Sequence, residues 1–137
     1  MSGWVTFVMG SREMAGALDE VREVVRATGL EELTGTRAPV TSLLELRGTP
    51  VPVVDLRSGS DPADDGDIMV LSTPQGVLGL AVDRVSSVLG PDELVPPDPS
   101  EPCPQGLPAY VVEVRRDPAG RAVLVVSLLA LAGLVSS

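Results

Sequence analysis

Carboxylates are the most plentiful reactive side chains in this sequence of 137 residues, which has 19 aspartates and glutamates and no histidine. Without an imidazole, the chain offers no such base for a serine or cysteine nucleophile and no imidazole metal ligand. Two carboxylates acting as acid and base are therefore the enzyme hypothesis to consider first. Asp55 follows an apolar segment, but Leu56 and Arg57 come after it, where an aspartic protease has a small residue and glycine. A carboxylate hydrolase is the enzyme alternative, and it predicts that Asp55 and Asp83 meet in one pocket.

The other reactive groups point to no catalytic site. Asp83 fits a residue at a strand end that hydrogen-bonds its own backbone. Cys103, the single cysteine, lies between two prolines with no basic neighbour to activate its thiol. Four aspartates have part of the spacing of a calcium loop but lack its bidentate glutamate and flanking helices, so we interpret them as a solvated acidic surface. They are Asp61, Asp64, Asp65 and Asp67. The sequence predicts no catalytic residue, no metal, no cofactor and no enzymatic activity.

Charge and composition limit the partners. All ten basic residues are arginines, scattered along the chain, and the formal net charge is -9. Such a chain is expected to repel nucleic acid and anionic membrane surfaces. The N-terminus has no basic residue before its apolar stretch, and the longest apolar run, residues 122–135, is shorter than the roughly 20 residues of a spanning helix. We expect a cytoplasmic protein that binds no nucleic acid and does not insert directly into a membrane.

Short apolar segments separated by glycine and proline predict a mostly β, barrel-like domain of about seven strands. One strand is expected over residues 4–9. Pro50 and Pro52 require an edge or a bulge, because proline has no N–H to donate to a neighbouring strand. Three hairpins are expected: 43–46 with 51–56 around a Gly48-Thr49 turn, 68–71 with 77–82, and 110–115 with 122–126 around a type I turn at 117–120.

Two segments have helical character. Apolar residues recur every three or four positions with charged residues opposite them, which predicts an amphipathic helix over residues 15–27. Glu23 and Val24 could equally begin a strand there. A second, short helix is predicted over residues 128–134. Nothing separates domains convincingly, so we expect a single domain over residues 1–137.

Two stretches carry a specific resemblance: LRGTPVPVVDLR at residues 46–57 and VLGLAVDRVSSVLG at residues 77–90. They resemble the two signature stretches of the CheW-like chemotaxis coupling domain. The order of the remaining pieces is similar too, from FVMG at 7–10 and VREVV at 21–25 to the closing segment 109–131. The resemblance covers almost the whole chain.

This resemblance implies two small five-stranded SH3-like barrels that form two lobes, share a core and have no catalytic activity. Proteins of this family are adaptors that link the cytoplasmic tips of methyl-accepting chemoreceptors to the regulatory domain of a CheA-type histidine kinase. The receptor tip is a helical hairpin whose apolar ridge docks between the lobes. The expected location is therefore the cytoplasm, at membrane receptor arrays.

The resemblance also implies a partner-binding site. Glu23 and Arg47 match a glutamate and an arginine that form an ion pair beside the receptor groove, and Val21 and Val85 match aliphatic contacts near it. An arginine–carboxylate fork between two elements would fix their relative orientation. In the alternative interpretation, Glu23 and Arg47 are separate solvated residues.

Three positions depart from the family pattern, where Met14 replaces a tyrosine and Ser42 and Glu113 replace glycines. They suggest a divergent member, and an accessory adaptor that binds receptors without the kinase is the alternative function. A stand-alone SH3-like module for proline-rich peptides would instead display clustered aromatics. The sequence provides only Trp4, Phe7 and Tyr110.

Overall fold

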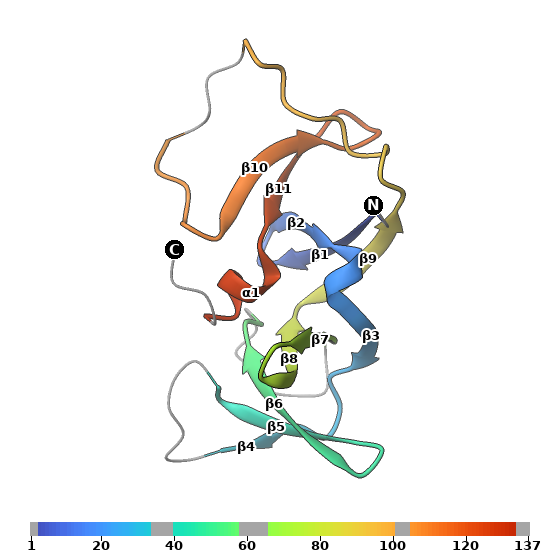
Figure 1. The fold of residues 1–137 in the computed structure, drawn as a ribbon, viewed down its shortest axis with the longest axis vertical. Coiled ribbons are helices and arrows are strands. Elements are labelled where there is room, and N and C mark those ends of the chain that lie inside the picture. The colour runs from blue at the N-terminus through green and yellow to red at the C-terminus, as the bar shows by residue number, and fades with distance from the viewer. Residues whose placement is uncertain (1–2, 34–39, 58–65, 101–104, 134–137) are drawn as a thin grey trace.

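The computed structural model describes residues 3–33, 40–57, 66–100 and 105–133, and two β-sheets follow one another along its long axis (Figure 1). The strand order is β10-β11-β2-β1-β9 in the five-stranded sheet and β3-β7-β8-β6-β5-β4 in the six-stranded sheet. A 3-10 helix, η1 (Leu18–Glu20), and an α-helix, α1 (Leu128–Leu131), complete the described elements. The strands are β1 (Trp4–Met9), β2 (Arg12–Ala17), β3 (Val21–Arg26), β4 (Glu31–Glu32), β5 (Ser42–Leu46), β6 (Thr49–Asp55), β7 (Asp67–Thr73), β8 (Gly76–Val82), β9 (Arg84–Leu89), β10 (Val111–Arg116) and β11 (Ala122–Val126).

The six-stranded sheet is an insertion within the five-stranded sheet. The chain forms β1 and β2, crosses through η1, builds the six strands of the second sheet and returns at Asp83 between β8 and β9. A bridge between Val95 and Arg116 brings the segment after β9 beside β10, the opposite edge of the five-stranded sheet. In the other sheet, residues 27–30 join the two edge strands β3 and β4. Each sheet therefore curls into a small SH3-like barrel, as predicted, although the second sheet has six strands instead of five.

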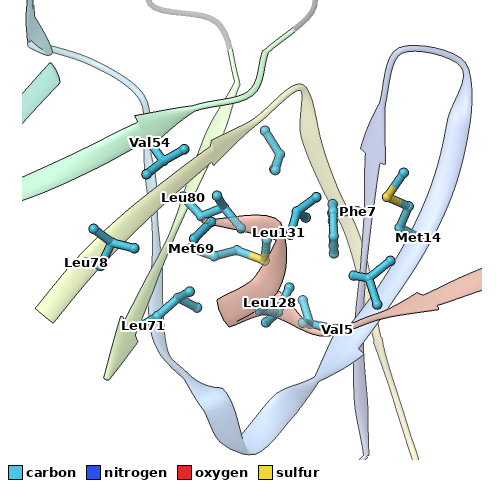
Figure 2. Packing of buried hydrophobic residues seen from close by; sticks show 13 residues of the cluster. Val5, Phe7, Met14, Val54, Met69, Leu71, Leu78, Leu80, Leu128 and Leu131 are labelled. Atoms are coloured by element: carbon cyan, nitrogen blue, oxygen red, sulfur yellow. The ribbon is translucent and has the colours of Figure 1, made fainter. Parts of the chain in front are cut away.

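The largest hydrophobic core lies between the two sheets, and we call it the central core (Figure 2). Phe7 from β1, Leu71 from β7 and Leu128 from α1 are fully buried there. Each sheet also has a smaller core of its own, built around Trp4 and Val123 in the five-stranded sheet. In the six-stranded sheet the corresponding buried residues are Ala27, Leu44, Val51, Val53, Ile68, Val70 and Ala81. The shared core that the resemblance implied is thus confirmed.

Helix α1 covers one end of the central core. Ser127 caps it, because its Oγ accepts a hydrogen bond from the backbone N–H of Ala130 at 3.2 Å. Leu128 then packs directly over β2, where a Cβ atom on Gly16 would lie 2.6 Å from the Leu128 side chain. The second predicted helix is confirmed in its position, although it ends at Leu131 within the described residues.

The amphipathic helix predicted over residues 15–27 is wrong. This segment forms the end of β2, then η1 and then β3. Burial alternates from residue to residue along β3, which is the period of a strand and not of a helix. Three of its six residues are valines, whose branched side chains favour a pleated surface. The apolar residues had a helical spacing only because they come from two successive strands, and the pairing of β3 with β7 determines the actual structure.

The first predicted hairpin is confirmed, but its turn lies one residue earlier, at Arg47 and Gly48. Both have positive φ angles, 50° and 83°, as a type I′ turn requires. Pro50 and Pro52 pair with β5 on one side, whereas β8 reaches β6 only from Val53 onward. The other side of β6 is therefore unpaired at both prolines, which agrees with the expected edge position.

The remaining hairpins are confirmed with small differences. Strands β7 and β8 pair up to Thr73 and Gly76, so their turn is tighter than predicted. In the β10–β11 turn, the backbone N–H of Gly120 donates to the carbonyl oxygen of Asp117 at 2.8 Å, as in a type I turn. The described residues form eleven strands instead of about seven, since β4 and β9 were missed and the helical prediction concealed β2 and β3.

Candidate partner-binding site

Two edge strands, β3 and β9, border the central core from different sheets. Residues paired across antiparallel strands point to the same face of a sheet. Four valines of β3 and β9 pair with residues of the central core, so their side chains face the junction between the sheets; we call these four the valine seam. On β3, Val21 pairs with Leu71 and Val24 with Met69. On β9, Val85 pairs with Phe7 and Val88 with Val5.

The valine seam is only partly covered. Val21 and Val85 pack against the central core, whereas Val24 and Val88 are 43% and 61% exposed. The resemblance predicted the two inner valines and missed the two outer ones. The signal was present as V-x-x-V in both strands, at VREV and VSSV. In a regular strand, residues three positions apart point to opposite faces. The β3–β7 and β1–β9 pairings each contain a register shift, so the two valines of each strand point to the same face.

Asp67, the first residue of β7, ties the two edge strands together. Its Oδ1 accepts a hydrogen bond from Arg26 Nη1 of β3 at 3.1 Å, and its Oδ2 accepts one from the backbone N–H of Val85 in β9 at 2.8 Å. The side chain is 13% exposed. The interpretation of Asp67 as part of a solvated acidic surface is therefore wrong, because its long-range partners lie outside the acidic run. Asp61, Asp64 and Asp65 lie outside the described residues, as does Cys103.

Glu23 and Arg47 form the ion pair that the resemblance implied. Arg47 Nη1 donates to Glu23 Oε1 at 3.1 Å and Nη2 donates to Oε2 at 2.5 Å, so the contact is bidentate. The hydrogen bond from Arg47 is the main cause that holds the pKa of Glu23 below its usual value. Arg47 lies at the tip of the β5–β6 hairpin, where its φ angle is positive, and its side chain contacts Glu23 of β3. The pair thereby links the edge strand β3 to the tip of the β5–β6 hairpin, and the interpretation as separate solvated residues is wrong.

This ion pair lies on the other face of β3 from the valine seam. Glu23 pairs with Val70, which belongs to the core inside the six-stranded sheet, whereas the adjacent Val24 faces the central core. A hollow of about 290 Å³ opens there at the mouth of the barrel. Its lining consists of Arg22, Glu23, Leu46, Arg47, Thr49, Val51, Val70 and Val77. Arg47 and Glu23 therefore meet each other, but the structure does not bring them into one pocket with Val21 and Val85.

The two carboxylates of the hydrolase alternative interact through their charges, since Asp83 acts to raise the pKa of Asp55, but their hydrogen bonds give them structural roles. Burial alone would raise the pKa of Asp55, but hydrogen bonds from Arg57 lower it below its usual value. Arg57 Nε and Nη2 donate to the two carboxylate oxygens of Asp55 at 2.9 and 2.8 Å. Asp83 Oδ2 instead accepts from the backbone N–H of Gly10 at 2.6 Å, a long-range contact that the prediction of a local turn missed. Asp55 lines a hollow with Arg57 that Asp83 does not line, so this arrangement does not favour acid–base catalysis.

The aromatic residues do not form a peptide groove. Trp4 and Phe7 are buried in two different cores, and Arg115 lies 5.0 Å from the centroid of the Trp4 ring. The three departures from the family pattern are accommodated. Met14 is buried in the central core, Ser42 is buried in β5, and Glu113 accepts a hydrogen bond from Arg115 Nε at 2.6 Å.

Neither a metal cluster nor a membrane-spanning helix is found in the part of the chain that the structure describes. No three potential ligands among His, Cys, Asp and Glu gather at one point there. No helix in the same residues has the length and apolar character needed to cross a membrane.

Comparisons with known proteins agree with this architecture. The family model for the CheW-like domain matches residues 3–135. The chain matches no curated protein. It is similar to the crystal structure of the scaffolding protein TtCheW from Thermoanaerobacter tengcongensis, with a TM-score of 0.70 and 21% sequence identity over 93% of this chain and 89% of that chain. That likeness shows the fold, and the family model shows the membership: the chain belongs to the CheW-like family.

Proposed function

We propose that this protein is a non-enzymatic adaptor of a bacterial chemosensory array, located in the cytoplasm at membrane receptors. It binds the helical tip of a chemoreceptor and the regulatory domain of a CheA-type histidine kinase, and it holds the two in a fixed arrangement. It acts as a single two-lobed domain. The observation that carries the proposal is the valine seam, an apolar surface shared by two sheets.

The seam suits the apolar ridge of a helical hairpin. Val24 and Val88 expose branched aliphatic side chains at the junction of the barrels, and Val21 and Val85 continue the apolar surface inward. Helix-in-groove recognition uses such aliphatic contacts, with the ridge of the helix buried between them. Because β3 and β9 belong to different sheets, a helix docked there contacts both lobes at once.

Glu23 and Arg47 support this surface from the other face of β3. The bidentate contact ties the edge strand β3 to the β5–β6 hairpin, so it positions the strand that carries Val21 and Val24. We therefore assign Glu23 and Arg47 to the partner-binding site as positioning residues. Val21 and Val85, together with Val24 and Val88, are assigned as the contact residues.

A binding experiment with two separate partners tests the proposal. The purified chain is mixed with a cognate receptor cytoplasmic fragment and, separately, with the regulatory domain of the CheA-type kinase from the same array. Binding to both supports the adaptor. Binding to the receptor alone supports the accessory adaptor, and binding to neither overturns the proposed function while leaving the family membership intact.

A further inference from the structure

Asp67 contacts both edge strands of the valine seam at the point where the chain crosses between the sheets. It pairs with Val82 at the end of β8, and the chain enters the five-stranded sheet two residues later. One carboxylate oxygen accepts from Arg26 of β3 and the other from the backbone N–H of Val85 of β9. A single side chain therefore spans two strands that belong to different sheets.

The two contacts are unequal. The side chain of Arg26 is 65% exposed, and an ion pair of that kind contributes little to stability. The hydrogen bond from the backbone N–H of Val85 is the stronger contact, because its acceptor is a charged carboxylate whose side chain is only 13% exposed to water. This hydrogen bond joins residues 18 positions apart and connects the six-stranded sheet to a valine of the seam.

We propose that Asp67, which lies on β7 beside the edge strand β3, is a positioning residue that holds β9 against the six-stranded sheet and thereby sets the shape of the valine seam. The effect on the fit of a receptor helix rests on the proposed function. The hydrogen bonds themselves involve no residue of the partner. Loss of the Asp67 side chain lets the two barrels shift relative to each other. Val24 and Val88 then no longer contact the same ridge of the receptor helix.

The test measures the relative orientation of the two sheets and the affinity for a receptor cytoplasmic fragment in the full chain. Orientation is obtained from residual dipolar couplings of the backbone amides, fitted separately for each sheet. For Asp67→Ala we expect a changed relative orientation and receptor binding weakened about tenfold, as for the loss of a hydrogen bond to a charged group. For Arg26→Ala we expect an unchanged orientation and less than about a threefold change in affinity.

Asp117→Ala is the matched control. Asp117 is also a largely buried carboxylate, 9% exposed at its side chain, and its Oδ1 accepts backbone N–H groups from Ala119 and Arg121 within one turn. We expect this variant to lose stability without altering the sheet orientation or receptor affinity. A purely structural role for Asp67 would make the two variants behave alike.

The inference is overturned if Asp67→Ala keeps the original sheet orientation, or if it binds the receptor fragment as tightly as the original protein. Should Asp67→Ala not fold, Asp67→Asn is measured in the same way, with a smaller change in the same direction expected because one acceptor oxygen remains. If the original protein does not bind the fragment, the proposed function fails, and the orientation measurement alone decides the role of Asp67.

Discussion

Val88 offers a direct test of the valine seam, because it is exposed in the free protein and lies on the edge strand β9. The change is Val88→Ala, which removes two carbon groups without disturbing a buried core. Each buried CH₂ contributes about 0.8 kcal/mol, and 61% of Val88 is available to a partner. The expected loss is about 1 kcal/mol of binding free energy, or about a fivefold increase in Kd for the receptor fragment.

Val112→Ala provides a matched control for this prediction. Val112 is also a valine on an edge strand and is 66% exposed, but it belongs to β10, at the opposite edge of the five-stranded sheet. Titration calorimetry of both variants with a receptor cytoplasmic fragment gives the two affinities, and thermal unfolding verifies that both remain folded. Equal affinities of the two variants, or an unchanged Kd for Val88→Ala, would refute the assignment of the seam.

The remaining predictions concern positioning, pH and packing. Arg47→Ala is expected to weaken receptor binding in a titration while the circular dichroism spectrum stays unchanged. Exchanging the two charges in Glu23→Arg/Arg47→Glu is expected to restore part of the affinity. If the affinity does not recover, the ion pair is not the cause of the loss. Burial raises the pKa of Glu20 in η1, so its ionisation opposes folding. Urea unfolding at pH 7 should therefore show Glu20→Gln to be more stable than the original protein. The difference should disappear as the pH falls below 4.5, the usual pKa of a glutamate, because Glu20 is then protonated in the folded and the unfolded protein. An equal gain in stability at low pH would contradict the electrostatic cause. Gly16→Ala places a Cβ 2.6 Å from Leu128, so we expect a loss of about 1–3 kcal/mol in the free energy of unfolding, as for other overpacked cores, and a normal urea midpoint would refute the packing argument.

The position of the valine seam has a mechanical consequence. The six-stranded sheet is an insertion between β2 and β9, so the chain crosses between the barrels at η1 and at Asp83. Asp83 anchors the second crossing, because its backbone N–H donates to the carbonyl oxygen of Val8 and its Oδ2 accepts from the backbone N–H of Gly10. A partner that binds across both barrels is therefore sensitive to their relative orientation as well as to the side chains it touches.

The sequence alone determined the class of protein and most local structure. The absence of histidine left the chain without an imidazole base or metal ligand, and two motifs indicated the family. The β10–β11 turn was predictable because Asp117, Pro118 and Gly120 have turn preferences that act within four residues. The pairing of Glu23 with Arg47 followed from the family motifs, since neither residue signals the other by its spacing along the chain.

Tertiary structure decided the features that depend on contacts between distant segments. The spacing of residues 15–27 fits a helix when taken alone, and only pairing of β3 with β7 makes it a strand. Val24 and Val88 each face the side of the strand that carries central-core residues, because register shifts in two separate strands turn them that way. Asp67 belongs to an acidic run in the sequence, yet the fold places it against Val85 in the other sheet. Periodicity and turn chemistry are local, whereas register, burial and long-range hydrogen bonds exist only after the two sheets have packed together.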